Sequence, residues 1–308
     1  MEGIAGKKQM VLGSQEFGHI VVGNGPLGSD LAAALEPSIL CARTQCFTLP
    51  SNIRLTRENL DFKDAVVWIV VKYRDLQDVL QSISRQNLPR GLVVCSNGLG
   101  IAHLYASESA LRAVPLVRCL LYYGVQTISG QLIRAGERRA SIAGLDHETF
   151  SEEISQTLQK RGFLVTREKS IALAEWKKIG VNIAVNTLAT LVDARNKVIL
   201  EHPELSARAE TLLAELRILA AREGFTIQEL SFETLRSSLE HHGENVNSSL
   251  QDLRRGKPPE VLQFLQSLLH LATAYGINTP ALQLAADDLE KLCKERGVMI
   301  HHSRSRTL

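Results

Sequence analysis

A strand, a glycine-rich turn and a helix follow one another directly near the start of this 308-residue chain, and this succession most constrains its fold. The apolar run His19-Ile20-Val21-Val22 leads into Gly23-Asn24-Gly25-Pro26-Leu27-Gly28, and Leu31-Ala32-Ala33-Ala34-Leu35 then has helical composition. In such a unit the first glycine permits the tight turn, the second lets a pyrophosphate approach, and the third allows close helix packing. The helix N-terminus adds free N–H groups and a positive dipole. We therefore predict dinucleotide binding here, in preference to a plain glycine turn.

The second expected strand indicates which dinucleotide binds. It covers Ser38-Ile39-Leu40-Cys41-Ala42 and ends at Arg43, about twenty residues after Gly23. An acidic side chain at this place would bind the ribose hydroxyls of NAD, whereas an arginine can pair bidentately with the additional 2′-phosphate of NADP. Arg43 therefore predicts NADP(H) as the cofactor. The alternative is an arginine that only lies on the surface.

Further apolar runs predict a parallel sheet that is covered on both faces. The run Ala65–Val71 leads to Lys72, and the run Gly91–Cys95 leads to Ser96 and Asn97. Ligands of open α/β sheets bind beyond the carboxyl ends of the strands, so Lys72 and Asn97 are expected near the cofactor, although each could be an ordinary loop residue. The other elements expected in this part are helices at 75–84 and 147–161 and strands at 114–124, 131–144 and 162–166. Turn signals stand at Ser129-Gly130 and at Ala135-Gly136-Glu137.

From Ile171 onward the pattern is helical only. The first of these helices is expected to run to about Leu200 and to break at His202-Pro203, because a proline disfavours helical geometry in the residue before it. The expected fold class is therefore α/β, with an N-terminal Rossmann-like doubly wound sheet domain followed by an all-helical C-terminal domain. The helices that follow are expected at 204–222, 226–239, 245–253, 258–276 and 279–297. The expected domains are a flexible extension at 1–17, an NADP-binding domain at 18–167, a helical domain at 168–298 and a flexible tail at 299–308.

A polar stripe runs along the first of the C-terminal helices. Lys178, Asn182 and Asn186 are spaced by four residues, so they lie on one helix face, whereas the residues between them are almost all apolar. A buried polar group without a partner costs roughly 1–3 kcal/mol, so the stripe must meet internal partners or face a cleft that holds a polar ligand. We favour the cleft. The alternative is a lysine whose stem packs on the surface while its ammonium group reaches water.

Composition excludes several classes of function. A formal net charge of +2, with lysines and arginines scattered along the chain, does not favour nucleic-acid binding. The five cysteines, Cys41, Cys46, Cys95, Cys119 and Cys293, show neither a disulfide framework nor the spacing of a metal site. The start of the chain lacks the apolar region of a signal peptide, and no apolar run is long enough to span a membrane. We therefore expect a cytoplasmic protein with reduced thiols, no metal ion and no membrane partner.

The motifs together resemble the ketopantoate reductase family over about residues 19–297. Members of this family use NADPH to reduce 2-dehydropantoate to pantoate, on the route to pantothenate and coenzyme A. The residues that carry the resemblance are Gly23, Gly25, Gly28, Arg43, Val71-Lys72, Asn97-Gly98, Trp176-x-Lys178-x-x-x-Asn182-x-x-x-Asn186 with Asn196 downstream, and Asn245-x-x-Ser248-x-Leu250-Gln251-Asp252 followed by Glu260.

The resemblance implies a role for each of these residues. Lys178 would be the general acid that protonates the keto oxygen, Glu260 would hold a substrate hydroxyl and help to position Lys178, and Ser248 would bind the carboxylate end. A partly desolvated lysine has a lowered pKa, which eases proton donation. Glu260 could instead simply favour the start of its helix. Asn97, Asn182, Asn186 and Asn245 would complete the substrate and nicotinamide cleft. The implied cofactor-binding residues are Gly23, Asn24, Gly25, Pro26, Leu27, Gly28, Arg43, Lys72 and Asn97.

The chain also departs from the family pattern, chiefly around the substrate. The segment between Arg43 and Asp64 is shorter than usual, and four further departures are Ser96, Ser249, Pro259 and Leu262. Three functions therefore stay open: reduction of ketopantoate, reduction of another 2-keto acid, and binding of NADP by a catalytically silent regulatory protein. Retention of Lys178, Ser248 and Glu260 argues against the last. The expected partner is a small 2-keto acid, and a homodimer is possible.

Overall fold

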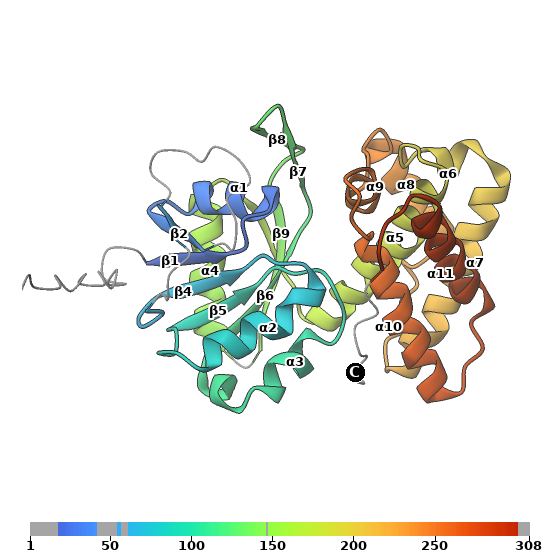
Figure 1. Ribbon diagram of the computed structural model, residues 1–308. Coiled ribbons are helices and arrows are strands. Elements are labelled where there is room, and N and C mark those ends of the chain that lie inside the picture. Colours follow the sequence, from blue (N-terminus) through green and yellow to red (C-terminus); the bar gives the residue numbers. More distant parts are fainter. Residues whose placement is uncertain (1–17, 42–53, 57–60, 146, 301–308) are drawn as a thin grey trace, which may run out of the picture. The chain divides into compact units, whose positions relative to one another are not determined.

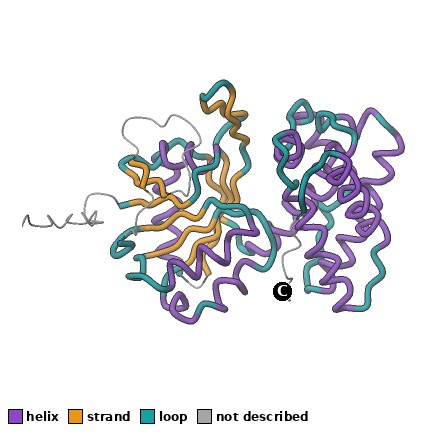
Figure 2. The backbone as a smooth tube through the Cα atoms, viewed as in Figure 1, coloured by secondary structure: helices purple, strands orange, loops and turns teal. Residues whose placement is uncertain are grey.

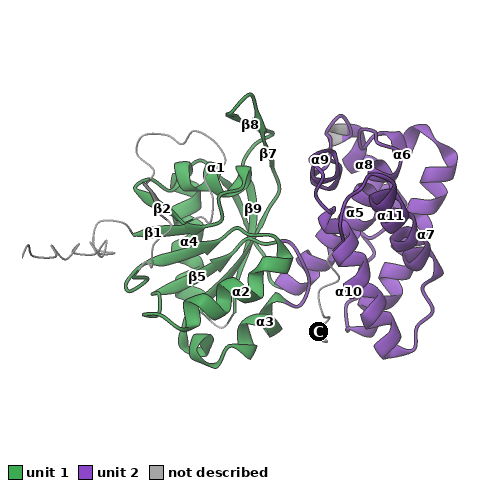
Figure 3. Cartoon of the chain, in the orientation of Figure 1, with its two compact units in different colours: residues 1–96, 101–169 green, residues 97–100, 170–308 purple. Residues whose placement is uncertain are grey.

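The computed structural model describes residues 18–41, 54–56, 61–145 and 147–300. The expectations for the extension at 1–17, for Arg43, for Cys46 and for most of the tail concern residues outside these ranges. The chain divides into two compact units, of which the first comprises residues 1–96 and 101–169 and the second residues 97–100 and 170–308 (Figure 3). The short segment 97–100 thus groups with the second unit, although it lies between two segments of the first.

The first unit is built on an eight-stranded sheet with the strand order β10-β9-β6-β5-β4-β1-β2-β3 (Figure 1). From β3 to β6 all neighbours are parallel, and the order reverses direction between β1 and β4. Such a reversal is the topological switch point at which doubly wound sheets bind their ligands. The strands are β1 His19–Val22, β2 Ser38–Cys41, β3 Arg54–Thr56, β4 Val66–Ile69, β5 Gly91–Val94, β6 Leu116–Leu121, β9 Arg139–Leu145 and β10 Leu164–Arg167.

Helices cover both faces of this sheet, as the tube in Figure 2 also shows. Val21 packs in a cluster with residues of α1 (Pro26–Ala34) and α4 (Glu148–Lys160). Its neighbour Ile20 packs on the other face with residues of α2 (Tyr73–Ser84) and α3 (Ile101–Ser107). Because successive strand residues point to opposite faces, a sheet that is buried on both sides needs continuous apolar strands. The predicted fold class is confirmed. The strands are continuous apolar runs because both faces of the sheet are buried.

Strand pairing beyond β6 differs from the expectation. The segment 131–144 breaks into two strands at the expected turn around Gly136, and its first part, β8 (Gln131–Ala135), pairs with β7 (Gly124–Ile128) in a separate two-stranded sheet. The second part is β9, which runs antiparallel to β6 and parallel to β10, so the large sheet is mixed. Ser129 and Gly130 form the β7–β8 turn with φ of 50° and 80°, a left-handed geometry that glycine adopts readily. The short elements β3 and α3 were not expected.

The described residues of the second unit form helices and loops and contain no strand. Its central helix is α5 (Ile171–Leu191), which contacts α7, α9, α10 and α11 and buries Ile179, Ile183 and Leu188. None of the described helices is long and apolar enough to cross a membrane. The other helices are α6 Val198–Glu201, α7 Pro203–Arg222, α8 Phe232–His242, α9 Ser248–Arg254, α10 Glu260–Tyr275 and α11 Pro280–Glu295.

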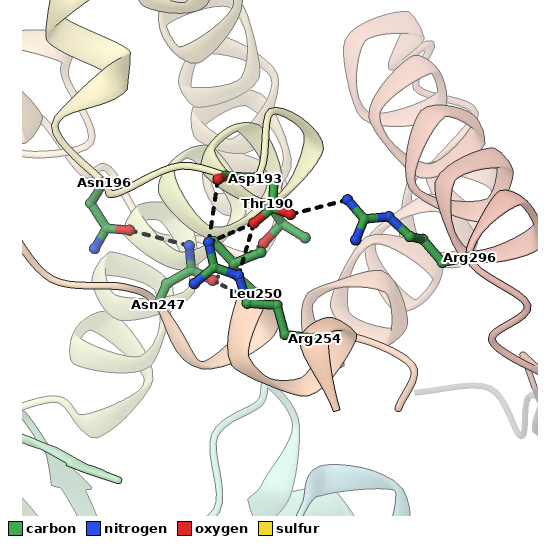
Figure 4. Close-up of polar contacts among 7 residues, drawn as sticks. All are labelled: Thr190, Asp193, Asn196, Asn247, Leu250, Arg254 and Arg296. Carbon is green, nitrogen blue, oxygen red and sulfur yellow. Dashed lines mark hydrogen bonds and ion pairs between the residues drawn. The ribbon is translucent and has the colours of Figure 1, made fainter. Parts of the chain in front are cut away.

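Helix α5 ends at Leu191, so the expected continuation to about residue 200 is wrong. Asp193 has a φ of 51°, a left-handed conformation that asparagine and aspartate tolerate better than most residues. Its carboxylate accepts hydrogen bonds from Arg254 Nε at 2.8 Å and from an Nη atom of Arg296 at 3.0 Å (Figure 4). Side chains from the ends of two other helices therefore hold Asp193, which lies two residues beyond the end of α5.

Two other helices begin later than expected because of their N-caps. The helix expected from Thr226 begins at Phe232, where Ser231 Oγ accepts a hydrogen bond from Thr234 N at 3.2 Å. The helix expected from Asn245 begins at Ser248, because Asn247 Oδ1 accepts from Leu250 N at 2.9 Å. A side-chain oxygen that satisfies a free N–H of the first turn fixes where a helix starts.

Candidate active site

The three glycines of the turn after β1 meet different surroundings. A Cβ atom on Gly23, whose φ is 120°, would lie 2.2 Å from the carbonyl oxygen of Val70, and one on Gly28 would lie 1.9 Å from the carbonyl oxygen of Gly23. A Cβ atom on Gly25 would meet no atom within 4 Å. Gly28 is thus required by the packing of the turn itself and Gly23 by the close approach of Val70 beyond β4, whereas the space beside Gly25 can admit a ligand. This arrangement fits a pyrophosphate.

The start of α1 favours an anion at the same place. Gly25 is the N-cap and Pro26 is the first helical residue, so the amides of Leu27 and Gly28 fall in the first turn, where a helix supplies no acceptor. No acidic residue occupies this turn. Free amide groups and the positive end of the helix dipole therefore face the space beside Gly25 without a competing carboxylate. Asn24 is half-buried within the turn.

Backbone hydrogen bonds hold the ends of three neighbouring strands at this turn. Gly23 N donates to Cys41 O at 3.0 Å, and Val70 N donates to Val22 O at 2.8 Å. Cys41 is the last residue of β2, and Arg43 follows two positions later, outside the described residues. Beyond β4, the half-buried Lys72 is the N-cap residue of α2. The glycine turn therefore lies beside the segments that lead to both predicted cationic contacts.

A fully buried arginine supports the carboxyl end of β5. Arg118 on β6 has no exposed surface, and its guanidinium donates to Val94 O and, at 3.1 Å, to Ser96 O. Ser96 Oγ in turn donates to Val71 O at 2.8 Å. The residue after Ser96 is Asn97, which groups with the helical unit. The sequence interpretation missed Arg118, although its position as the single charged residue within an apolar strand was the signal.

The polar stripe of α5 is present as a half-buried face. Lys178, Asn182 and Asn186 are each partly exposed, whereas Ile179 and Ile183 beside them are 2% and 0% exposed. Helical periodicity explains this contrast, because residues four apart share a face. The polar groups of the stripe can therefore reach a solute while the rest of α5 packs in the core of its unit.

Helices α9 and α10 bring further candidate residues to α5. Both contact α5 and each other. Ser248 is the exposed first residue of α9, Asn245 lies exposed just before that helix, and Glu260 is the first residue of α10 with 9% exposure. A carboxylate is favoured in the first turn by the helix dipole, but burying it is costly unless it has polar partners. Two neighbouring helices thus present a hydroxyl and a carboxylate close to their first turns.

The predicted site residues fall into two groups. The described part of the first unit contains Lys72 and the residues of the glycine turn, and the described part of the second contains Asn97, Lys178, Asn182, Asn186, Asn245, Ser248 and Glu260. In the described ranges no group of histidine, cysteine or acidic residues could hold a metal ion. Sequence reasoning gave no role to Asn247 and Ser249, two buried residues on either side of Ser248.

Comparison with known proteins shows what this chain resembles. A profile of the family described as Ketopantoate reductase PanE/ApbA C terminal matches residues 170–292, which include α5, α9 and α10. A 2-dehydropantoate 2-reductase of Archaeoglobus fulgidus is 26% identical over 278 residues, which cover 84% of this chain and 92% of the relative. One of Yersinia pestis is 31% identical over 137 residues, which cover 44% of this chain and 43% of that protein. The chain is therefore similar to the ketopantoate reductase family over residues 170–292 and to a 2-dehydropantoate 2-reductase over most of its length.

Solved structures share the fold of this chain. A dimeric ketopantoate reductase from Staphylococcus aureus superposes with a TM-score of 0.73 at 18% identity and covers 91% of this chain and 99% of its own. A D-mandelate dehydrogenase in ternary complex with NADH and anilino(oxo)acetate gives a TM-score of 0.77 at 16% identity, over 91% of this chain and all of its own. At these identities the likeness concerns the fold alone.

Proposed function

We propose that this chain is an NADPH-dependent oxidoreductase that reduces a 2-keto acid, with 2-dehydropantoate (ketopantoate) as the substrate and pantoate as the product. The observation that carries the proposal is the half-buried stripe of Lys178, Asn182 and Asn186 on α5, within the region that matches the family. The A. fulgidus relative, which aligns over most of both chains, is a 2-dehydropantoate 2-reductase.

The dinucleotide would be held by the first unit. Backbone amides of the α1 N-terminus would bind the pyrophosphate beside Gly25, and Arg43 and Lys72 would supply positive charge for its phosphates. When bound, NADPH supplies a hydride to the keto carbon of the substrate. The NADH complexes of the D-mandelate dehydrogenase support a nicotinamide cofactor in this fold. The preference for NADPH rests on Arg43 and on the family.

The helical unit would bind and protonate the substrate. A small 2-keto acid is anionic, so it requires a cation and several hydrogen-bond donors. In the proposed mechanism Lys178 donates a proton to the keto oxygen as negative charge develops there, and Ser248 donates to the carboxylate. Glu260 accepts a hydrogen bond from a substrate hydroxyl and helps to orient Lys178. The side-chain amides of Asn97, Asn182, Asn186 and Asn245 position the substrate and the nicotinamide.

Replacing Lys178 tests this mechanism. General acid catalysis typically contributes about 10²–10⁴-fold, so Lys178→Ala should lower kcat for ketopantoate by about that factor while NADPH still binds. Absorbance of NADPH gives the rate, and fluorescence titration gives the cofactor affinity. Lys177→Ala is the matched control, because Lys177 lies on the same helix but its ammonium pairs with Glu229 at 2.6 Å on the surface. A folded Lys178→Ala variant with nearly normal turnover would remove Lys178 from the mechanism.

A second candidate is the reduction of another 2-keto acid. It is favoured by the departures at Ser249, Pro259 and Leu262, which lie beside Ser248 or Glu260 and change the surroundings of the substrate. The D-mandelate dehydrogenase that shares the fold was captured with an aryl 2-oxo acid derivative, anilino(oxo)acetate. A panel of ketopantoate, branched 2-keto acids and aryl 2-oxo acids, compared by kcat/KM, decides between the candidates. Absence of turnover with every acid would instead favour the NADP-binding regulatory protein.

We further propose that the protein acts in the cytoplasm as a homodimer. Four cysteines within the described residues are free thiols, as expected in a reducing compartment. The S. aureus ketopantoate reductase with this fold is dimeric. Light scattering after gel filtration measures the mass of the particle, and a value near 34.0 kDa, the mass of one chain, would contradict the dimer.

A further inference from the structure

One buried amide, that of Asn247, joins three segments of the helical unit (Figure 4). Asn247 is 6% exposed, and its Oδ1 accepts hydrogen bonds from Leu250 N at 2.9 Å and from Thr190 Oγ1 at 3.3 Å. Its Nδ2 donates to Asn196 Oδ1 at 3.1 Å. Because Leu250 N can only donate, the atom facing it must be the oxygen, which fixes the orientation of the amide.

The three partners of Asn247 have different places in the unit. Leu250 lies in the first turn of α9, Thr190 lies in the last turn of α5 and is fully buried, and Asn196 lies in the loop that follows α5. The Asn247 side chain therefore connects the start of the helix that carries Ser248 to the end of the helix that carries the polar stripe. A cap that served only its own helix would need the bond to Leu250 alone.

The other neighbour of Ser248 is also held. Ser249 is 1% exposed, and its Oγ accepts a hydrogen bond from Val261 N at 3.4 Å. Val261 is the second residue of α10, directly after Glu260. Ser248 thus lies between two buried residues, one tied to α5 and the other tied to α10, while its own side chain is exposed. Its backbone is fixed from both sides and its hydroxyl stays available to a solute.

The loop after α5 holds the preceding residues as well. Asn196 N donates to Asn245 O at 3.1 Å, and Lys197 N donates to Gly243 O at 2.8 Å. Asn245 and Ser248, the two residues of this segment with a proposed contact to the substrate, are therefore held against the same loop. Asn247 lies between Asn245 and Ser248 in the sequence, and its side chain is hydrogen-bonded to Asn196 of this loop and to Thr190 of α5.

We infer that Asn247 is a positioning residue for substrate binding, which sets the Ser248 hydroxyl relative to the α5 stripe through its bonds to Thr190 and Asn196. The inference rests on the proposed function, because it gives Ser248 the role of binding the carboxylate of the 2-keto acid. Reactions between bound groups are sensitive to small displacements of the positioning side chains. The role of Asn247 should thus be visible in the KM for the acid.

The decisive variant is Asn247→Ala in the full-length chain. It removes all three hydrogen bonds, so KM for the most active 2-keto acid of the panel should rise about tenfold, whereas KM for NADPH should stay within about twofold. Ser248→Ala should raise the same KM. If Asn247 acts through Ser248, the double variant should bind the acid no more weakly than Ser248→Ala does. If Asn247 were only a structural cap, Asn247→Ala would lower stability, and its effect on KM would not depend on Ser248.

A conservative variant and a control complete the experiment. In Asn247→Asp the carboxylate can accept from Leu250 N and Thr190 Oγ1, and the amide of Asn196 can turn to donate to it, so KM should return to within about threefold of the unsubstituted protein. The control is Ser231→Ala, which removes the exposed cap of α8. It should lower the melting temperature without changing KM for the acid.

The outcomes separate the inference from the proposed function. An unsubstituted protein that reduces none of the acids overturns the proposed function and the inference with it. An active protein in which Asn247→Ala leaves KM unchanged overturns the inference alone. The inference also fails if the increases in KM caused by Asn247→Ala and Ser248→Ala multiply in the double variant. It fails likewise if Ser231→Ala raises KM as Asn247→Ala does. The inference is supported if Asn247→Ala raises KM on its own but not in the Ser248→Ala background, and if Asn247→Asp returns KM to near that of the unsubstituted protein.

Discussion

Gly25 and Gly28 lie three positions apart in one turn but should respond in opposite ways to the same methyl group. At Gly28 the added Cβ would lie 1.9 Å from a carbonyl oxygen of the turn, so the backbone must shift. Overpacking of this kind costs about 1–3 kcal/mol, and Gly28→Ala should lower the melting temperature measured by circular dichroism.

Gly25→Ala should instead leave the fold intact. The φ of Gly25 is −64°, which alanine adopts without strain, and the added Cβ would meet no protein atom within 4 Å. The methyl group would occupy the space proposed for the pyrophosphate, so the Kd for NADPH should rise at least about tenfold with little change in stability. Unchanged NADPH affinity in this variant would place the dinucleotide elsewhere.

His19, on β1, should make the protein less stable in acid. Trp68 Nε1 donates to its Nδ1 at 3.2 Å, and burial, reinforced by the charges of Arg161 and Arg90, lowers the pKa of His19 to about 4. The unfolded chain, with a histidine pKa near 6.5, binds the proton more readily, so stability is fully present above about pH 6.5 and is lost as the pH falls toward 4.

The size of this effect can be measured with one variant. A pKa lowered from 6.5 to about 4 corresponds to about 3 kcal/mol of unfolding free energy between the two pH limits. Urea unfolding at pH 7.5 and pH 4.5 should therefore show a smaller loss of stability in His19→Gln than in the unsubstituted protein, because the glutamine does not titrate. An equal loss in both proteins would mean that His19 is accessible to protons in the folded state.

The end of helix α5 depends on both the backbone and the charge of Asp193. Desolvation of its carboxyl group acts to raise the pKa, but hydrogen bonds from Arg254 and Arg296 outweigh it, and the pKa lies below its ordinary value. Asp193→Asn keeps a residue type that tolerates a φ of 51° and loses the charge, whereas Asp193→Ala loses both. The alanine variant should be less stable than the asparagine variant by about 1 kcal/mol in chemical denaturation. Equal stabilities would mean that the left-handed backbone adds no cost.

Local signals made some elements predictable. The strand, glycine turn and helix around Gly23, Gly25 and Gly28 could be placed from the sequence because their order and spacing are a local signal. The stripe of Lys178 and Asn182 could be placed because helical periodicity needs no tertiary information. These features depend on residues that are close in the chain.

Elements that depend on distant partners could not be placed. Helix α5 stops where Asp193 meets Arg254 and Arg296, both far away in the sequence, and β9 takes its antiparallel direction from its pairing with β6. The role inferred for Asn247 likewise arises from Thr190 and Asn196. Arg118 is a buried charge whose guanidinium donates to carbonyl groups of another strand and of the loop after it, both distant in the sequence.

At the scale of the whole molecule, the cofactor that binds more tightly should stabilise the chain more at a given concentration. A ligand at one hundred times its Kd adds about 2.7 kcal/mol to the unfolding free energy. Because Arg43 is proposed to pair with the 2′-phosphate, NADPH should raise the melting temperature more than NADH at the same concentration. Arg43→Ala should narrow that difference, because a charge-assisted bidentate contact is lost. Equal shifts by the two cofactors in the unsubstituted protein would contradict the preference.

The grouping of residues 97–100 with the helical unit limits how this protein can be recombined with its relatives. A chimaera joined at a single point after Lys169 would take Asn97 from one parent and Lys178 from the other, although both fall in the same compact unit. A graft that respects the units needs two further junctions, one on each side of the segment 97–100. A library of hybrids should therefore transfer those four residues together with the helices.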